Sequence, residues 1–282
     1  MPTSPSSSVQ DARRAVAAQL REIRRDAGLS GKDVAERTGW YRSKVSRLEN
    51  AVTPPSDEDV RAWCRACDAD GLAADLIAAS RSADSMYVEW RRLQRTGLRR
   101  LQESYVPLFD RTQVFRVYCS NVVPGLLQTD EYAAALLGSI AAFRETPDDV
   151  TDAVAARIER SRVIREGGHR FALLVEEAVL RHRVGGAAVM AGQLGYLLSI
   201  MALPSVSLGV VPFSADRRMW MLETFSVYDE GQAQVELLTA QVNVTAPSEV
   251  AQYLKAFGEF SKLAVYGAGA RARITAAIDA LG

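Results

Sequence analysis

A run of hydrogen-bond donors and cations at residues 41–47 is the part of the sequence whose residue types are best suited to chemistry. Hydroxyl, guanidinium and ammonium groups can donate to phosphate oxygens and to the edges of nucleic-acid bases. Val45 and Leu48 lie three residues apart within and just after this run, which is the spacing of one helix face. The outward-facing side chains of that helix would be Tyr41, Arg42, Ser43, Lys44, Ser46 and Arg47.

A preceding short helix and a tight turn would position these side chains. Ser30 is a good N-cap for this helix, and Asp33 follows three residues later. Gly39 allows the turn into the next helix, and Ala35 is small where the two helices cross. The pattern predicts a helix-turn-helix, whose later helix can enter the major groove of DNA. We assign DNA contacts to the six residues above and to three neighbours: Ser30, Lys32 and Asn50.

The rest of the chain predicts two domains after a short tail. Residues 1–9 are rich in Ser and Pro and are expected to be a disordered tail. Residues 10–82 contain five helical patterns and form the predicted helix-turn-helix domain. Residues 83–282 mix helical patterns with clustered strands, which is typical of an α+β domain. The predicted fold class is therefore mainly α with an α+β C-terminal part.

Several predicted elements of the larger domain concern possible binding surfaces. A long basic helix is expected over residues 86–103, where it would either extend a DNA-binding surface, bind acidic groups of a partner, or be a solvated face. Its shared face would carry Arg91, Arg92, Arg95 and Arg99. A strand is expected over residues 220–228, with Trp220 as a candidate pocket edge. The turn Val123-Pro124-Gly125 would either shape a binding edge or fix a strand-to-helix corner.

The charge of the chain is unevenly distributed although its formal net charge is zero. Residues 10–50 carry ten basic and six acidic side chains, and residues 81–100 carry six basic and two acidic ones. The remainder is therefore acidic. This distribution fits a local anion-binding surface on an acidic body, although two solvated basic helix faces would give the same counts.

Other residue patterns do not form a catalytic or metal site. Cys64 and Cys67 have the CxxC spacing, but there is no second pair to complete a zinc site, and both fall on an apolar helix face. His169 and His182 accompany no nucleophile-elbow motif. We therefore expect no enzyme activity, no metal and no cofactor.

Two further local features are expected to have structural roles. Glu176 and Glu177 are adjacent, so one is expected to face solvent while the other binds an Arg. Gly185-Gly186 belongs to no phosphate-binding motif and is expected to mark a helix boundary.

No apolar run approaches the roughly 18 residues needed to span a bilayer, and the N-terminus does not resemble a signal peptide. The expected location is the cytoplasm, in association with the nucleoid and without a membrane partner.

The first domain resembles the phage repressor/Cro-like helix-turn-helix of the xenobiotic response element type. The resemblance covers roughly residues 13–70 and rests on residues 28–30, 34–39 and 43–50, which read Gly-Leu-Ser, Val-Ala-Glu-Arg-Thr-Gly and Ser-Lys-Val-Ser-Arg-Leu-Glu-Asn. Two positions depart from the family pattern. Ala51 replaces a helix-terminating Gly, and Gly31 replaces a Gln that often contacts DNA. The resemblance implies binding to double-stranded DNA.

The second domain resembles the C-terminal domain of a large actinobacterial group of helix-turn-helix regulators. The resemblance covers about residues 85–265. It rests on the Val-Pro-Gly-Leu-Leu-Gln-Thr string at 123–129 and on shorter matches at 132–133, 176–181, 184–186 and 193–194. That domain has no settled biochemical function, and its genes often lie beside a gene for a small partner protein. The resemblance implies a regulator with a sensing or partner-binding body.

Together these observations predict a sequence-specific DNA-binding transcriptional regulator. The C-terminal domain is expected to sense a ligand or a small protein encoded in the same operon. One helix-turn-helix reads few base pairs, so a homodimer is expected, with its interface in residues 85–282. The alternative is an antitoxin-like protein-interaction module that binds a small partner protein. An enzyme tethered to DNA is the least favoured alternative.

Overall fold

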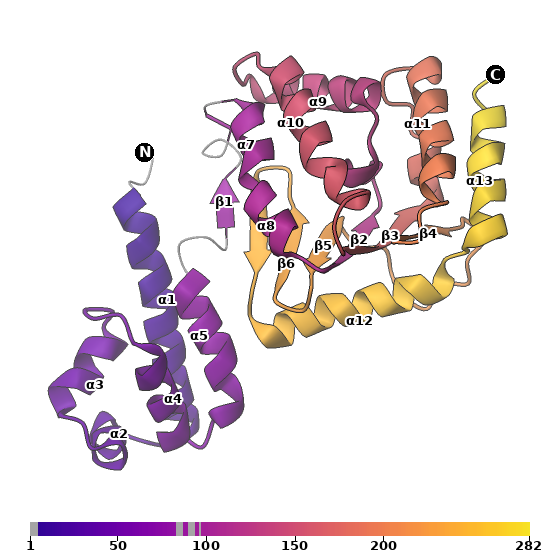
Figure 1. The fold of residues 1–282 in the computed structure, drawn as a ribbon. Coiled ribbons are helices and arrows are strands. Elements are labelled where there is room, and N and C mark those ends of the chain that lie inside the picture. The colour runs from indigo at the N-terminus through magenta and orange to yellow at the C-terminus, as the bar shows by residue number, and fades with distance from the viewer. Residues whose placement is uncertain (1–4, 83–86, 90–93, 96) are drawn as a thin grey trace. The chain divides into compact units, whose positions relative to one another are not determined.

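The computed structural model describes residues 5–82, 87–89, 94–95 and 97–282 (Figure 1). The chain divides into two compact units. One contains residues 1–87 and 243–250, and the other contains residues 88–242 and 251–282. The first is mainly helical and the second combines helices with a mixed sheet, so the predicted fold class is confirmed.

Within residues 5–82, the N-terminal part of the first unit consists of five α-helices and one short 3-10 helix. Their bounds are α1 Pro5–Asp26, α2 Gly31–Thr38, α3 Arg42–Glu49, α4 Asp57–Ala66, η1 Asp70–Leu72 and α5 Ala73–Ser82 (Figure 1). Helix α1 begins at Pro5, not at Gln10, so residues 5–9 of the expected tail are helical.

Apolar side chains from α1 to α5 form one buried core. Leu20, Val34, Val45 and Leu48 are each at most 2% exposed, and Trp63 is fully buried among them. The indole Nε1 of Trp63 donates to the carbonyl oxygen of Leu20 at 3.0 Å, which satisfies the one polar atom of this side chain and joins α4 to α1. The residues that the sequence pattern assigns to the inner faces of α2 and α3 are therefore the residues that hold these helices in place.

A sheet in the order β1-β7-β6-β5-β2-β3-β4 forms the centre of the larger part. Strands β2, β3 and β4 are parallel neighbours, whereas β5 pairs antiparallel with both β2 and β6. The strand bounds are β1 Tyr87–Glu89, β2 Val114–Cys119, β3 Arg170–Glu176, β4 Val206–Val211, β5 Phe225–Tyr228, β6 Gln232–Glu236 and β7 Ala240–Val244.

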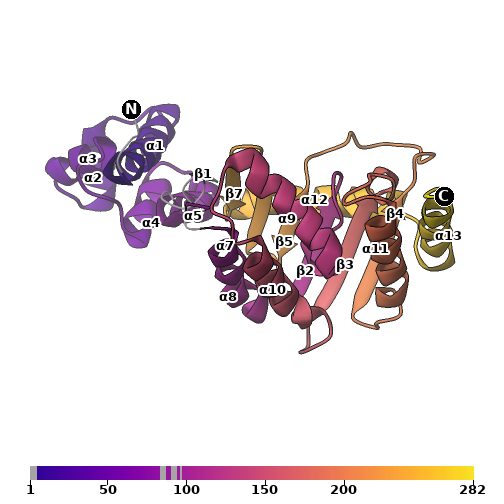
Figure 2. The same cartoon turned by 90° about the horizontal axis from the view of Figure 1, so that it is seen from above.

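Helices cover both faces of this sheet, as parallel strands require. Figure 2 shows α9, α10 and α11 on one side and α12 on the other. Strand β2 therefore alternates: Phe115, Val117 and Cys119 join the core on the first side, while the Tyr118 ring stacks on Phe260 of α12 at 4.1 Å. The helix bounds are α7 Leu98–Ser104, α8 Val106–Arg111, η2 Gly125–Leu127, α9 Asp130–Arg144, α10 Val150–Arg160, η3 Ser161–Ile164, η4 Glu177–Leu180, α11 Ala187–Ile200, α12 Pro247–Leu263 and α13 Gly267–Asp279.

The predicted basic helix over residues 86–103 is wrong. Residues 87–89 form a strand, α7 begins only at Leu98, and Gly97 stands at φ +100°, outside the helical region. Asp149 determines this start: its carboxylate oxygens accept from the backbone N–H groups of Leu98 at 2.8 Å and Arg99 at 2.9 Å. A Cβ atom at Gly97 would stand 2.1 Å from Oδ2 of Asp149, so this capping contact leaves no space for a side chain at position 97. Arg91 and Arg92 lie outside the described residues.

The strand expected over residues 220–228 is also shorter than predicted. Within this range, Phe225–Tyr228 form the strand, and Trp220, the candidate pocket edge, is 72% exposed. Strand β7 has no counterpart in the sequence prediction. Among the described helices, none combines the length and the apolar composition that crossing a membrane requires.

Candidate nucleic-acid interface

Helices α2 and α3 are joined by the turn that the sequence predicts. Ser30 caps α2: its hydroxyl accepts from the backbone N–H of Asp33, and the Asp33 carboxylate accepts from the backbone N–H of Ser30 at 2.7 Å. At the other end of α2, Gly39 has φ +70°, and the next backbone N–H, that of Trp40, donates to Ala35 at 2.9 Å. Both ends of α2 are thus fixed by local backbone chemistry.

The C-terminal end of α3 is held by α1. The Nε atom of Arg24 lies 2.6 Å from Oε1 of Glu49, and Arg21 donates to the Glu49 carbonyl oxygen. The chain then leaves α3 through Ala51 at φ +55°, the left-handed position that the family resemblance marks as a Gly site. An Ala there costs about 1 kcal/mol relative to the right-handed region. The surrounding contacts must offset this cost.

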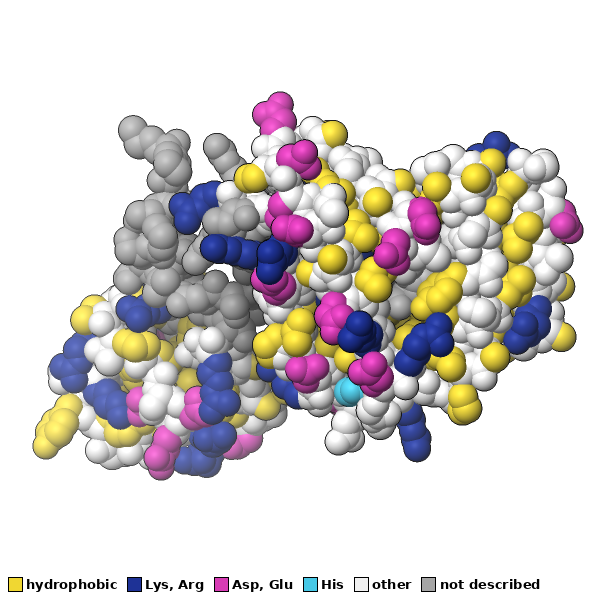
Figure 3. Space-filling model, turned by 45° about the horizontal axis from the view of Figure 1, so that its top comes forward, with side chains coloured by type: hydrophobic (Ala, Val, Ile, Leu, Met, Phe, Trp, Pro, Cys, Tyr) yellow, Lys and Arg dark blue, Asp and Glu magenta, His cyan; other side chains and the backbone are white. Residues whose placement is uncertain are grey.

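The outward face of α3 carries the predicted donors. Tyr41 is 86% exposed and immediately precedes the helix, and Arg42 and Ser43 occupy its first turn with exposed side chains. Ser46 and Arg47 are exposed one turn later. In Figure 3, Lys and Arg side chains are interspersed with acidic ones over the helix-turn-helix domain, at the lower left of the view. These positions suit a helix whose first turn approaches base edges.

Lys44 is the exception on this face, because its ammonium group is bound within the domain. It lies 2.5 Å from Oδ1 of Asp59 on α4 and 4.1 Å from the centre of the Trp40 ring. Burial tends to raise the pKa of Asp59, but the hydrogen bonds from Lys44 and Ser56 outweigh it and lower that pKa below its ordinary value. Lys44 therefore stabilises the contact between α3 and α4.

The remaining predicted contact residues are also involved in local interactions. The Asn50 amide donates to the carbonyl oxygen of Ser46 at 2.8 Å and to its hydroxyl at 3.3 Å, so these two side chains form one unit. Lys32 is 60% exposed and pairs with Glu36 at 3.5 Å. Ser30 contributes its hydroxyl to the cap. Whether these residues touch DNA stays a prediction.

The side chains considered for other chemistry have structural partners. Cys64 and Cys67 are buried free thiols, and burial raises the pKa of Cys64 to about 11, which keeps it protonated at neutral pH. His169 and His182 each have Nδ1 within hydrogen-bond distance of a main-chain carbonyl oxygen. Within the described parts of the chain, no three His, Cys, Asp or Glu side chains cluster as metal ligands.

The expectation that one of Glu176 and Glu177 faces solvent is wrong, because both are at most 3% exposed. Glu176 accepts from the Tyr118 hydroxyl at 2.8 Å and pairs with Arg217. Glu177 pairs with Arg181 at 3.3 Å and Arg273 at 3.1 Å. The chain turns from β3 into η4 between the two residues, and this change of direction lets both carboxylates reach arginines.

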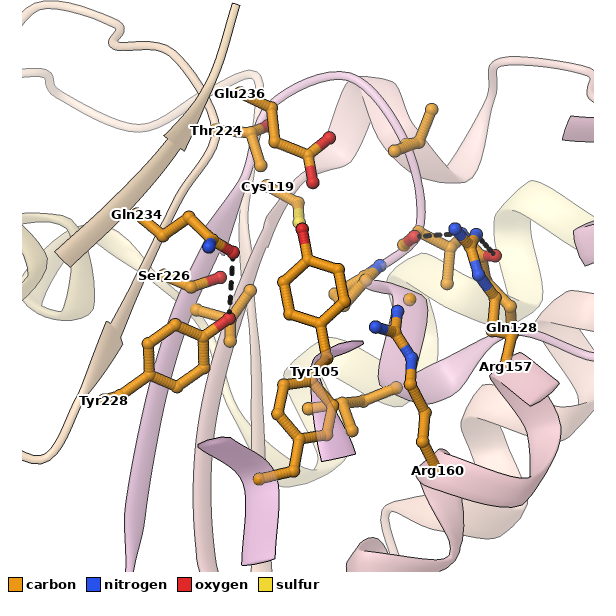
Figure 4. A pocket seen from close by; sticks show the side chains of 17 residues that line it. Tyr105, Cys119, Gln128, Arg157, Arg160, Thr224, Ser226, Tyr228, Gln234 and Glu236 are labelled. Carbon is orange, nitrogen blue, oxygen red and sulfur yellow. Dashed lines mark hydrogen bonds between the residues drawn. The ribbon is translucent and has the colours of Figure 1, made fainter. Parts of the chain in front are cut away.

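A cavity of about 120 Å³, lined by both polar and apolar side chains, lies among β2, β5, β6, α8 and α10 (Figure 4). Arg157 and Arg160 enter it from α10, and the Arg160 guanidinium lies 4.6 Å from the centre of the Tyr105 ring. Arg157 donates to the side-chain oxygens of Gln102 at 2.9 Å and Gln128 at 2.6 Å. Burial is the main cause that lowers the pKa of Arg157 to about 10, so this guanidinium stays charged at neutral pH.

Sequence reasoning missed this cavity, apart from the turn at 123–125. The lining comes from four separate segments, residues 105–109, 117–128, 157–160 and 224–236. These segments are brought together by the crossover from β2 to β3, which includes α10, and by the antiparallel pairing of β5 with β2. The one local signal is the pair of Arg residues three apart on α10, which is the spacing of one helix face.

Comparisons with known proteins agree with this division of the chain. A helix-turn-helix domain model matches residues 15–76, which cover the cap, turn and donor face described above. No curated protein and no solved structure matches the chain. A second family model matches residues 102–276, well over half of the chain and including the whole cavity. The protein therefore belongs to the family described as Domain of unknown function (DUF5753), with a helix-turn-helix domain preceding the family domain.

Proposed function

We propose that the protein is a sequence-specific DNA-binding transcriptional regulator, in which residues 10–82 bind DNA and residues 83–282 sense a ligand or a small protein. The observation that carries the first part is the outward face of α3. Its first turn presents Arg42 and Ser43 to solvent, while Val45 and Leu48 are buried and fix its orientation. The helix-turn-helix match supports DNA as the partner of this face.

The contacts within the domain divide the roles among the proposed DNA-binding residues. Arg42 and Ser43 are proposed to read bases, because the N-terminal end of the recognition helix enters the groove most deeply. Arg47 is proposed to bind a phosphate. Lys44 is the weaker phosphate candidate, because its ion pair with Asp59 must be given up first. Tyr41, Ser46, Asn50, Ser30 and Lys32 are proposed to flank these contacts.

Regulation at a single genomic site requires more sequence information than one helix-turn-helix reads. We infer that two copies act together, with half-sites about 34 Å apart or a multiple of that spacing. The core of residues 13–81 uses most apolar side chains of its helices, which favours the larger domain as the dimer interface. Sedimentation of the full chain, alone and on DNA, tests this arrangement; a monomer under both conditions contradicts it.

The proposed function is tested by selection from random double-stranded DNA with the full chain, followed by gel shifts of the selected sequence. We expect one enriched motif with two-fold symmetry and binding that weakens as salt rises. A set of selected sequences without a shared motif contradicts sequence-specific binding. The variant compared with the full chain is Arg42→Ala, which should still fold because the Arg42 side chain is exposed.

A further inference from the structure

Arg160 has hydrogen-bond donors that the described chain does not satisfy. Its Nε and Nη1 atoms are buried, and neither has a hydrogen-bond partner. The faces of Tyr105 and Phe109 lie 4.6 Å and 5.1 Å from the guanidinium carbon, and these contacts stabilise its charge but accept no hydrogen bond. Buried charged donors without acceptors are unfavourable, so the arrangement indicates that an acceptor comes from outside the chain.

Several neighbouring acceptors in the cavity already have partners. The side-chain oxygens of Gln102 and Gln128 bind Arg157. The hydroxyl of Tyr228 donates to Gln234 at 3.3 Å, as the dashed line in Figure 4 shows. Glu236 also lines the cavity, but no ion pair joins it to Arg157 or Arg160 among the described residues. The two arginines and Glu236 give the cavity a net charge of one positive unit, which matches a monoanion.

The size and the remaining lining of the cavity limit the ligand further. Its volume of about 120 Å³ is close to that of a cavity of roughly 150 Å³ that accepts benzene. Phe109, Val117, Val123 and Leu126 supply an apolar wall beside the guanidinium group. A ligand of this size therefore needs one charged end and an apolar body.

We propose that this cavity binds a small organic monoanion, whose carboxylate accepts from Arg160 and whose apolar body packs against the apolar wall. Carboxylates match the planar guanidinium of Arg by paired hydrogen bonds. The inference rests on the proposed sensing role of residues 83–282 and gives that role a binding site and a ligand class. Arg157 positions the site through Gln128, which in turn donates to the carbonyl oxygen of Val123 at 2.8 Å.

Calorimetric titration of the full chain without DNA tests the site directly. The probes are benzoate, phenylacetate and isovalerate, each compared with its neutral amide and with inorganic phosphate. We expect at least one carboxylate to bind at least tenfold more tightly than its amide and than phosphate. If none of the three carboxylates binds, or if phosphate binds more tightly than all of them, the inference is wrong.

Three variants distinguish this site from general attraction of anions. Arg160→Gln should weaken carboxylate binding at least tenfold, whereas Arg162→Gln removes an Arg that is 62% exposed and should leave binding unchanged. Glu236→Gln removes the opposing charge and should strengthen binding several-fold. Equal effects of Arg160→Gln and Arg162→Gln would overturn the assignment. Far-ultraviolet circular dichroism checks that each variant is folded.

The same proteins separate failure of this inference from failure of the proposed function. Gel shifts on the selected DNA are made with and without the tightest carboxylate, which should change DNA affinity at least fivefold. Carboxylate binding that depends on Arg160, in a protein without DNA preference, would support the cavity and contradict the regulator. DNA preference without carboxylate binding would do the reverse.

Discussion

Lys44 and Asp59 join α3 to α4 by an ion pair in which Nζ and Oδ1 are 2.5 Å apart. The same Asp59 carboxylate accepts from the backbone N–H of Ser56, where it completes the capping box of α4. One carboxylate therefore stabilises the start of α4 and the orientation of α3. Lys44 therefore serves the fold, whereas Arg42, Ser43 and Arg47 of the same helix have exposed side chains.

This ion pair gives the stability of the helical domain a defined dependence on pH. The folded-state pKa of Asp59 is lowered, so its contribution is present above its ordinary pKa of about 4 and is lost as pH falls below that value. Asp59→Asn should lower the free energy of unfolding by about 1 kcal/mol at pH 7, and the difference should shrink towards pH 2. Urea unfolding followed by tryptophan fluorescence measures it. Glu58→Gln, on the same turn, is the control; a difference that stays constant with pH contradicts the prediction.

Arg42→Ala should reduce affinity for the selected DNA by about 1–3 kcal/mol and relax the preference at one base pair, expected to be a guanine. The reason is that a bidentate contact from Arg to guanine discriminates among bases. Repeating the selection with the variant measures the change. Arg65→Ala on α4 changes the net charge equally at another exposed position. An unchanged motif after Arg42→Ala would remove Arg42 from the base-reading role.

Arg47→Gln should weaken binding to all sequences by a similar factor and leave the selected motif unchanged. Loss of one phosphate contact should also lower the slope of log affinity against log salt by about one. Gel shifts at a series of salt concentrations, on the selected and on a scrambled sequence, measure both effects. Should the slope remain that of the unmodified chain, Arg47 does not contact a phosphate.

Gly39→Ala should destabilise the helical domain by about 1–2 kcal/mol, because φ is +70° and an L side chain is strained there. A Cβ at position 39 would meet no atom within 4 Å, so the cost comes from the backbone conformation alone. Gly31→Ala is the matched control. It places a methyl group in ordinary contact with Val45 at the start of α2 and should leave stability unchanged or raised. Equal losses from both substitutions would contradict this explanation.

The helix-turn-helix could be predicted from the sequence because its determinants are local. Ser30 and Gly39 each act on backbone groups within a few residues, and each has the predicted role. Ala51 has a left-handed backbone conformation at the position where the resembled family usually has Gly. Apolar spacing of three and four residues sufficed to find the buried side chains Val45 and Leu48.

The errors lie where distant residues decide the local structure. The spacing of arginines favoured a helix through position 97, but the carboxylate of Asp149, more than 50 positions later, determines where α7 begins. Similarly, Glu177 is buried because Arg273 reaches it from α13. The cavity around Arg160 depends on strand pairing, and no single segment of its lining forms a recognisable motif.

The contact between Gly97 and Asp149 has a consequence for divergence among members of the family. Asp149 is the N-cap residue of α10, while its carboxylate caps α7, so one residue lies at the start of both helices. A replacement at either position alone removes the cap or collides with it. Relatives that keep a carboxylate at the position of Asp149 should therefore keep Gly at 97, and relatives with a side chain at 97 should lack that carboxylate.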